Sequence, residues 1–219
     1  MDRKEFLKTG LAVGIAGTVG SYARGAPQQR QATAAEIEGP FYPLHAQKDK
    51  DFDLTTFDGK QQQAAGEHLF IEGVVLDEQS RPIEDAMVDL WQANAYGRYR
   101  HPHDRSQGKL DPNFQGWAIV QSGAAGGFKF KTVLPGTYLA AKNWERPPHI
   151  HFKVMKRGYV ELITQMYFPD HPLNKRDFLL QRKKAYEQKG MVAELVKKTP
   201  RTYRYTIVLA TAQPAGRLR

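Results

Sequence analysis

Two histidines separated by a single residue give the strongest local signal for chemistry in this sequence. They are His149 and His151, in the run RPPHIHF at residues 146–152. If this run is a β-strand, side chains two residues apart project to the same face, while Ile150 and Phe152 point into a core. Two imidazoles about 6–7 Å apart on one face can converge on one metal ion. The same pattern also occurs in structural or surface histidines, so the pair alone does not identify a metal site.

The remaining ligands of such a metal ion have to be His, Asp, Glu or Tyr, because the sequence contains no cysteine. Oxygen and imidazole ligands favour iron, manganese or zinc over copper(I) or an iron–sulfur cluster. The nearest carboxylate, Glu145, is expected to face solvent. Tyr138, at the end of the turn LPGTY, and Tyr99, shortly after a predicted strand that ends at Gln92, are better placed. An isolated tyrosine is more often a core residue with a satisfied hydroxyl, so the residues alone leave the ligand set open.

The elements that must position these side chains are predicted to be β-strands. Short runs rich in Val, Ile, Phe, Tyr and Thr alternate with turns that contain Gly, Pro, Asn or Asp. The predicted strands cover residues 69–76, 86–92, 116–120, 127–133, 149–155, 162–168 and 201–210. Six or seven short strands joined by tight turns predict an all-β fold, an antiparallel β-sandwich.

Two segments depart from the strand pattern, and we predict a short surface helix for each. They are residues 175–189 and 191–198, which precede the last predicted strand. Gly190 ends the first segment and Pro200 follows the second, as expected at helix ends.

Residues 1–26 are predicted to be an export signal. Arg3 and Lys4 precede an apolar run at residues 11–19, and Ser21 and Ala23 have the spacing of a cleavage site. The run RKEFLK is similar to the twin-arginine export motif, with a lysine in place of the second arginine. We therefore expect a periplasmic or otherwise exported protein without stable membrane association after processing. The alternative is an uncleaved tail on a cytoplasmic protein.

The rest of the chain is predicted to be a linker, residues 27–35, followed by one folded domain, residues 36–219. The formal net charge is +9, of which residues 1–30 hold five Lys/Arg and two Asp/Glu, which leaves +6 for the remainder. A basic protein can bind nucleic acid. Here the charge is spread out, with its densest stretches at residues 182–184 and 197–201, which favours solvated surfaces. We expect no nucleic-acid partner, and a mild positive charge also attracts small anionic aromatic substrates.

Several motifs together resemble the intradiol ring-cleaving dioxygenases, most closely the iron-bearing β-subunit of the protocatechuate 3,4-dioxygenase type. The resemblance covers residues 36–210, which makes residues 36–219 the expected catalytic domain. The motifs, in chain order, are EGPFYP at 38–43, VDLWQANAYGRY at 88–99, LDPNF at 110–114, PGTY at 135–138, RPPHIHF at 146–152 and ITQMYF at 163–168.

The resemblance implies a ligand set and a substrate pocket. The four residues that it implies as ligands of Fe(III) are Tyr99, Tyr138, His149 and His151. Phenolate is a hard anionic donor that stabilises iron(III), as tyrosine does in catalase. The pocket residues that it implies are Arg146 and Gln165, close to the reacting ring, together with Trp91 and Tyr42. Tyr138 is also implied as a general base, and Arg146 and Gln165 as catalytic residues.

The activity implied by the resemblance is the opening of a catechol-type ring by O₂ between its two hydroxylated carbons. Both oxygen atoms enter the product, a muconate-type diacid, and an oligomer is expected. Ala140 stands where protocatechuate enzymes carry a tryptophan, and the connection from Tyr138 to His149 is two residues shorter than in the family. The ring substituents of the substrate therefore stay open. Three alternatives remain: a non-catalytic binding module of the same fold, a zinc hydrolase that uses the histidine pair, and a nucleic-acid-binding protein.

Overall fold

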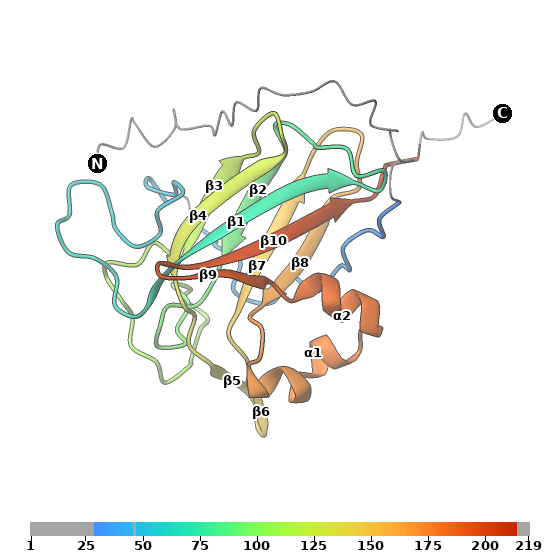
Figure 1. Cartoon of the computed structure of the whole chain (residues 1–219). Helices are drawn as coiled ribbons and strands as arrows, with labels where there is room; N and C mark the ends of the chain where they lie inside the picture. The colour runs from blue at the N-terminus through green and yellow to red at the C-terminus, as the bar shows by residue number, and fades with distance from the viewer. Residues whose placement is uncertain (1–28, 46, 214–219) are drawn as a thin grey trace.

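The computed structural model describes residues 29–45 and 47–213, and two four-stranded sheets form the body of the molecule (Figure 1). The predicted export signal at residues 1–26 lies outside the described residues. One sheet has the order β4-β1-β10-β9, the other has the order β3-β2-β7-β8, and β5 pairs only with β6. The strands are β1 (His68–Asp77), β2 (Met87–Trp91), β3 (Trp117–Gln121), β4 (Gly127–Val133), β5 (Tyr138–Ala141), β6 (Trp144–Arg146), β7 (His149–Met155), β8 (Leu162–Tyr167), β9 (Glu194–Lys198) and β10 (Arg201–Leu209).

The core lies between the two sheets and is rich in aromatic rings. Phe152 of β7 lies 6.1 Å from Phe128 of β4 and 5.4 Å from Tyr205 of β10, measured between ring centroids, so side chains from opposite sheets interlock. The described helices are the 3₁₀ helix η1 (Pro172–Arg176), α1 (Phe178–Gln181) and α2 (Ala185–Met191). Both α-helices and the β5–β6 hairpin lie at one end of the sandwich (Figure 1). None of the helices in the described part of the chain has the length and apolar character of a membrane span.

The prediction of an all-β sandwich with short helices is confirmed, with one difference in strand direction. Each of the seven predicted strands is present, and the bounds differ from the prediction by one residue at most. Every named strand pair is antiparallel except β1 with β10, which run parallel from the pair Phe70–Thr202 to the pair Asp77–Leu209. Parallel neighbouring strands need a long connecting segment. All the elements from β2 to β9 form the connection between β1 and β10.

The prediction of a second helix at residues 191–198 is wrong, because these residues end α2 and then form β9. The N–H of Ala193 donates to the carbonyl oxygen of Tyr167 at 2.9 Å, and Val192 forms a parallel bridge with the same residue. The chain leaves this contact extended and pairs with β10 at the edge of its sheet. The first predicted helix, at 175–189, is divided: Asp177 ends η1 and caps α1, and α2 begins only at Ala185.

The segment before β1 runs across the edges of both sheets. The N–H of Thr33 donates to the carbonyl oxygen of Val208 in β10 at 3.0 Å. Three residues later, the N–H of Glu36 donates to the carbonyl oxygen of Ile163 in β8 at 2.8 Å. Residues 37–41 then continue from this attached segment to the end of the sandwich where the histidines of β7 lie.

Two glycine substitutions test the packing with the same chemical change. A Cβ on Gly73 of β1 would lie 2.0 Å from the Phe128 ring, which packs over this glycine, whereas a Cβ on Gly190 in α2 meets nothing within 4 Å. We expect Gly73→Ala to lower the free energy of unfolding by about 1–3 kcal/mol because the core is overpacked. Gly190→Ala should raise it by up to about 1 kcal/mol through helix propensity. Urea denaturation measures both, and an unchanged stability in Gly73→Ala would contradict the packing described.

Candidate metal centre

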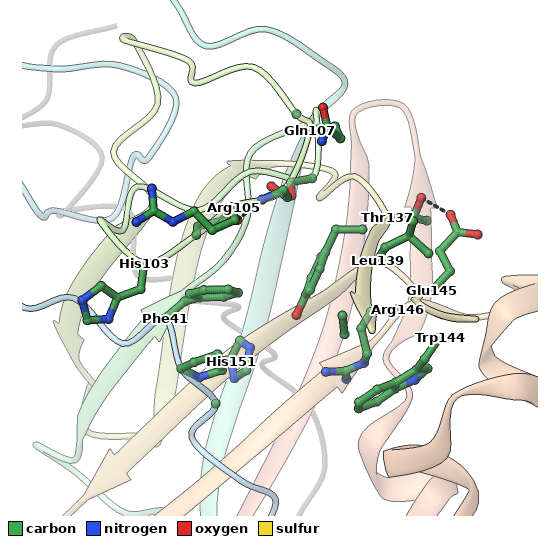
Figure 2. Close-up of a pocket in the computed structure, with 18 of the residues that line it drawn as sticks. Phe41, His103, Arg105, Gln107, Thr137, Leu139, Trp144, Glu145, Arg146 and His151 are labelled. Atoms are coloured by element: carbon green, nitrogen blue, oxygen red, sulfur yellow. Dashed lines mark hydrogen bonds between the residues drawn. The ribbon is translucent and has the colours of Figure 1, made fainter. Parts of the chain in front are cut away.

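A cavity of about 730 Å³ opens at the end of the sandwich that carries the hairpin (Figure 2). Its wall is built from residues 37–41, the loop 103–108 and both strands of the β5–β6 hairpin, with single residues from β7, β8 and α1. Four of the predicted site residues belong to this wall: Tyr138, Arg146, His151 and Gln165. Side chains with predicted chemistry from four different strands therefore face one space.

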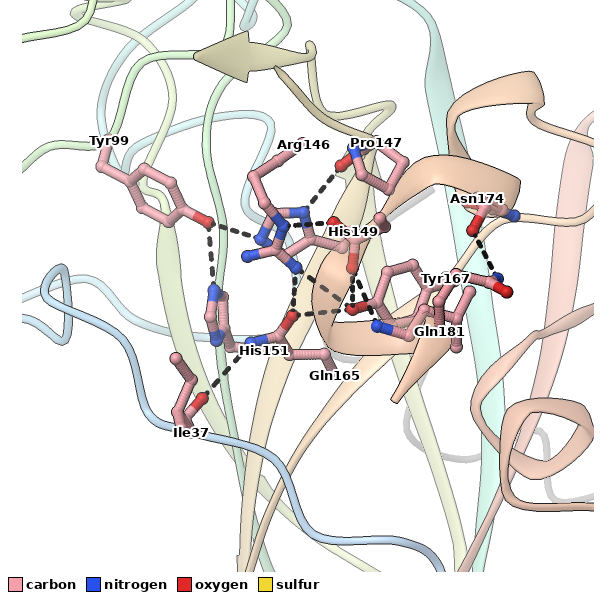
Figure 3. Close-up of polar contacts among 12 residues, drawn as sticks. Ile37, Tyr99, Arg146, Pro147, His149, His151, Gln165, Tyr167, Asn174 and Gln181 are labelled. Atoms are coloured by element: carbon pink, nitrogen blue, oxygen red, sulfur yellow. Dashed lines mark hydrogen bonds and ion pairs between the residues drawn. The ribbon is translucent and has the colours of Figure 1, made fainter. Parts of the chain in front are cut away.

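The histidine pair and Tyr99 converge at this wall, to which His151 belongs (Figure 3). The hydroxyl oxygen of Tyr99 lies 3.3 Å from Nε2 of His149 and 3.1 Å from Nε2 of His151. All three side chains are buried. Nδ1 of His149 lies 2.7 Å from the carbonyl oxygen of Pro147, so a proton held there leaves the Nε2 lone pair free for a metal. Both histidine side chains thus project from the same face of β7, as expected from the sequence.

Tyr138 approaches the same group from the hairpin. Its ring centroid lies 5.7 Å from that of Tyr99 and 5.7 Å from that of His149. Two glycines let the two tyrosine-bearing turns touch: a Cβ on Gly97 would lie 2.1 Å from the carbonyl oxygen of Thr137, and one on Gly136 would lie 2.4 Å from the N of Gly97. Gly97 also has φ +72°, a conformation that suits glycine. This backbone contact sets the separation of Tyr99 and Tyr138.

Burial fixes the protonation of these side chains when no cation is present. Burial, reinforced by the positive charge of Arg146, lowers the pKa of His151 to about 3 and that of His149 well below its usual value. Burial also raises the pKa of both tyrosines. The imidazoles are therefore neutral and able to coordinate, whereas ionisation of the phenols requires a nearby positive charge.

The donor set fits ferric iron. Two phenolates and two neutral imidazoles around Fe³⁺ leave one residual positive charge, and anionic oxygen donors stabilise the ferric state. Over residues 29–45 and 47–213, no group of three or more His, Asp or Glu side chains could hold a metal ion. Catalytic zinc sites in enzymes usually combine three such ligands. The candidate centre offers only two histidines and needs tyrosine oxygens as well, which does not match the site expected of a zinc hydrolase.

Arg146 is held rigidly beside the centre by a buried polar network (Figure 3). Its Nε donates to Oδ2 of Asp177 at 2.6 Å, and its Nη2 donates to Oε1 of Gln165 at 2.6 Å and to the hydroxyl of Tyr167 at 3.1 Å. Oδ1 of Asp177 accepts from the hydroxyl of Tyr167 at 3.1 Å and caps α1 by accepting from the N–H of Leu180 at 2.9 Å. The guanidinium is thus a fixed cation whose charge is balanced by one carboxylate.

Two residues predicted to bind substrate, Tyr42 and Trp91, do not lie on the wall of the cavity. Trp91 stacks on the His151 ring with centroids 4.9 Å apart and an interplanar angle of 15°, and Tyr42 packs edge-on against Trp91. The hydroxyl of Tyr42 donates to buried Asp89 at 2.8 Å, which also accepts from Nε1 of Trp117 at 2.8 Å. In the structure these side chains support His151 from behind.

Several site residues were not predicted from the sequence. The sequence does contain a helix-cap signal at Asp177, because an aspartate directly before an apolar run is a typical N-cap. Nothing in the sequence links that cap to Arg146. Tyr167 lies within a quoted motif without an assigned role. The large apolar residues of the cavity wall without a predicted role include Ile37, Phe41, Leu139, Trp144 and Leu179. Only the tertiary fold brings them together.

The family model described as "Dioxygenase" matches residues 37–211. The protocatechuate 3,4-dioxygenase beta chain of Burkholderia cepacia is 36% identical over 167 residues, which cover 74% of this chain and 71% of the relative. The chain belongs to the intradiol dioxygenase family, a class of oxidoreductases.

Two further relatives define the extent of the similarity. The hydroxyquinol 1,2-dioxygenase of Rhizobium sp. (strain MTP-10005) is 27% identical over 159 residues, and this match covers 67% of the chain and 51% of the relative, so the chain spans about half its length. The solved dioxygenase domain of a dioxygenase–carbohydrate-binding fusion from Streptomyces sp. SirexAA-E superimposes with a TM-score of 0.64. It is 26% identical and is covered completely, against 83% of this chain.

The Arg146–Asp177 pair makes a stability prediction. Arg146 is 4% exposed and Asp177 is 0% exposed, so Asp177→Ala leaves a buried cation without its partner and should lower the free energy of unfolding by about 3–5 kcal/mol. The exposed pair of Arg204 with Glu194 is the control, and Glu194→Ala should cost about 0–1 kcal/mol. Both values come from urea denaturation. Equal losses in the two variants would show that Asp177 does not anchor Arg146.

Proposed function

We propose that this protein is an Fe(III)-dependent intradiol dioxygenase that cleaves a catechol-type ring with O₂ to a muconate-type diacid. The observation that carries the proposal is the meeting of the Tyr99 hydroxyl with Nε2 of both histidines, at 3.3 and 3.1 Å, with Tyr138 facing them. Tyr99, Tyr138, His149 and His151 would hold the iron. Bound there, ferric iron would supply the Lewis acidity that makes a catechol reactive toward O₂.

Tyr138 is the ligand best placed to exchange a proton with substrate. Its side chain is half-buried and belongs to the cavity wall, whereas Tyr99 is 2% exposed and lies outside that wall. With iron bound, Tyr138 would be a phenolate, and a substrate hydroxyl in the cavity could give its proton to that oxygen, so that Tyr138 acts as general base. Tyr99 would stay in place as the other anionic donor.

Arg146, the cross-strand partner of Tyr138 in the hairpin, and Gln165 act on the substrate ring beside Tyr138. The guanidinium is oriented before substrate arrives by Asp177, Gln165 and Tyr167, so it stabilises negative charge that develops on the ring without reorganisation. Nε2 of Gln165 donates to the carbonyl oxygen of Ile37 at 3.2 Å, which fixes the amide. Both side chains are buried.

Oxygen uptake by the iron-loaded protein with a panel of catechols tests the function. We expect consumption of O₂, a ring-opened diacid and a burgundy colour from tyrosinate-to-iron charge transfer. A colourless protein that takes up no oxygen would instead be a binding module of the same fold.

Tyr99→Phe should weaken the colour and lower kcat/KM by about 100-fold or more, because even partners of metal ligands cost about 10–100-fold when they are lost. Tyr186→Phe is the matched control, since Tyr186 is 51% exposed on α2, and it should change neither quantity. Full colour and full turnover in Tyr99→Phe would refute the ligand assignment.

We further propose that residues 1–26 direct export and that the domain at residues 36–219 works as an oligomer. The motif RKEFLK and the following apolar run support export. Fractionation of cells that express the full chain should recover the protein outside the cytoplasm, and light scattering should give a mass above one chain. Recovery in the cytoplasm alone would exclude export. A mass of one chain would exclude the oligomer.

A further inference from the structure

The cavity beside the candidate metal centre is too large for a single ring. It has a volume of about 730 Å³. A cavity of ~150 Å³ is enough to hold one benzene molecule. Cavities of roughly 300–1,000 Å³ are typical of sites for much larger organic ligands. A catechol that reaches Tyr138 and His151 therefore occupies only a minor part of the space.

The remaining space has two sides of different chemistry. Figure 2 shows His103 and Arg105 on one side of Phe41 and His151, and Leu139 and Trp144 on the other. The first side continues through Ser106 and Gln107 and is polar. The second side carries the larger apolar residues Leu139, Ala140, Trp144 and Leu179. The hydrogen-bonded pair Thr137–Glu145 and the guanidinium of Arg146 lie at its edge. The cavity thus has a polar arm and an apolar arm that meet at the candidate metal centre.

The apolar arm is the one suited to hold further substrate. Leu139 is 69% exposed, so apolar area of the arm faces solvent and would be covered by a ligand. A flat aromatic group gains most there, because it buries a large area and can contact the Trp144 indole. In the polar arm the same group would remove water from the exposed, charged side chain of Arg105.

We propose, resting on the proposed function, that the substrate is a catechol that carries a second aromatic ring, and that this ring binds in the apolar arm. The dihydroxylated ring lies at Tyr138 and His151. The second ring lies between the hairpin and α1, against Leu139 and Trp144. Ala140 contributes to the space for the second ring, because a larger side chain at this position would fill part of the arm.

The test compares two substrates on the iron-loaded full chain: catechol and 4-phenylcatechol. We expect kcat/KM for 4-phenylcatechol to exceed that for catechol by about tenfold or more, the scale that one well-filled apolar subsite supplies. The ratio of the two kcat/KM values is the quantity followed in every variant, because it is independent of the amount of iron bound.

Matched variants locate the second ring. Ala140→Trp fills the apolar arm and should lower the ratio by about tenfold. Gln107→Trp places the same bulk in the polar arm and should leave the ratio within about twofold. Leu139→Asp, at a position that is 69% exposed, puts a charge into the apolar arm without filling it and should also lower the ratio.

Each other outcome overturns the proposal. Turnover of catechol with no preference for 4-phenylcatechol would refute the two-ring substrate and leave the proposed function intact. A ratio that falls only in Gln107→Trp would refute the assignment of the arm. Consumption of neither substrate by iron-loaded protein would refute the proposed function as well.

Discussion

The structure depends on neutral, buried nitrogen and oxygen donors that meet without a carboxylate among them. His149 and His151 are held neutral by burial and by Arg146, and Tyr99 is held protonated by burial. Such a cluster has donor atoms in place but lacks a positive charge that would ionise the phenols. A trivalent cation satisfies this requirement better than a divalent one. Most of the surrounding structure can be understood as a way of keeping these donors close together and dry.

Three parts of the chain bring the donors together, and each uses a different physical device. Strand alternation puts both imidazoles on one face of β7. The Gly97–Gly136 contact lets two turns approach more closely than residues with side chains would allow. The stack of Trp91 on His151, supported by the Tyr42–Asp89 hydrogen bond, fixes the ring from behind. The candidate metal centre therefore rests largely on the sandwich, whereas the cavity wall comes mostly from loops and a short hairpin.

Much of the fold could be predicted from the sequence, because the long strands have strong patterns. The run at residues 149–155 alternates and is rich in β-branched and aromatic residues, and its strand was predicted to the residue. The run at 191–198 has no decisive pattern, and its conformation is set by backbone pairing with Tyr167 and β10. The short β5 and β6 were also missed, since three or four residues carry too little periodicity.

The site also has a part that could be predicted from the sequence and a part that could not. The residues of the candidate centre are recognisable from motifs, and the structure brings all four together. The role of Asp177 could not be predicted, because a helix cap and a guanidinium 31 positions apart share no local pattern. The placement of Tyr42 and Trp91 behind His151 was missed for a related reason: Trp91 is the cross-strand neighbour of His151, and strand pairing is not visible within one motif.

The parallel pairing of β1 with β10 has a consequence for how the chain becomes a protein. The first strand of the domain sits between β4 and β10, so its sheet is incomplete until the last strand has been synthesised. Pairing over such a long stretch of sequence is entropically slow. The histidines of β7 are made well before that moment, yet Phe152 beside them packs on Tyr205 of the final strand. The sandwich around the candidate metal centre is therefore completed only when the last strand is available, after nearly the whole domain has been synthesised.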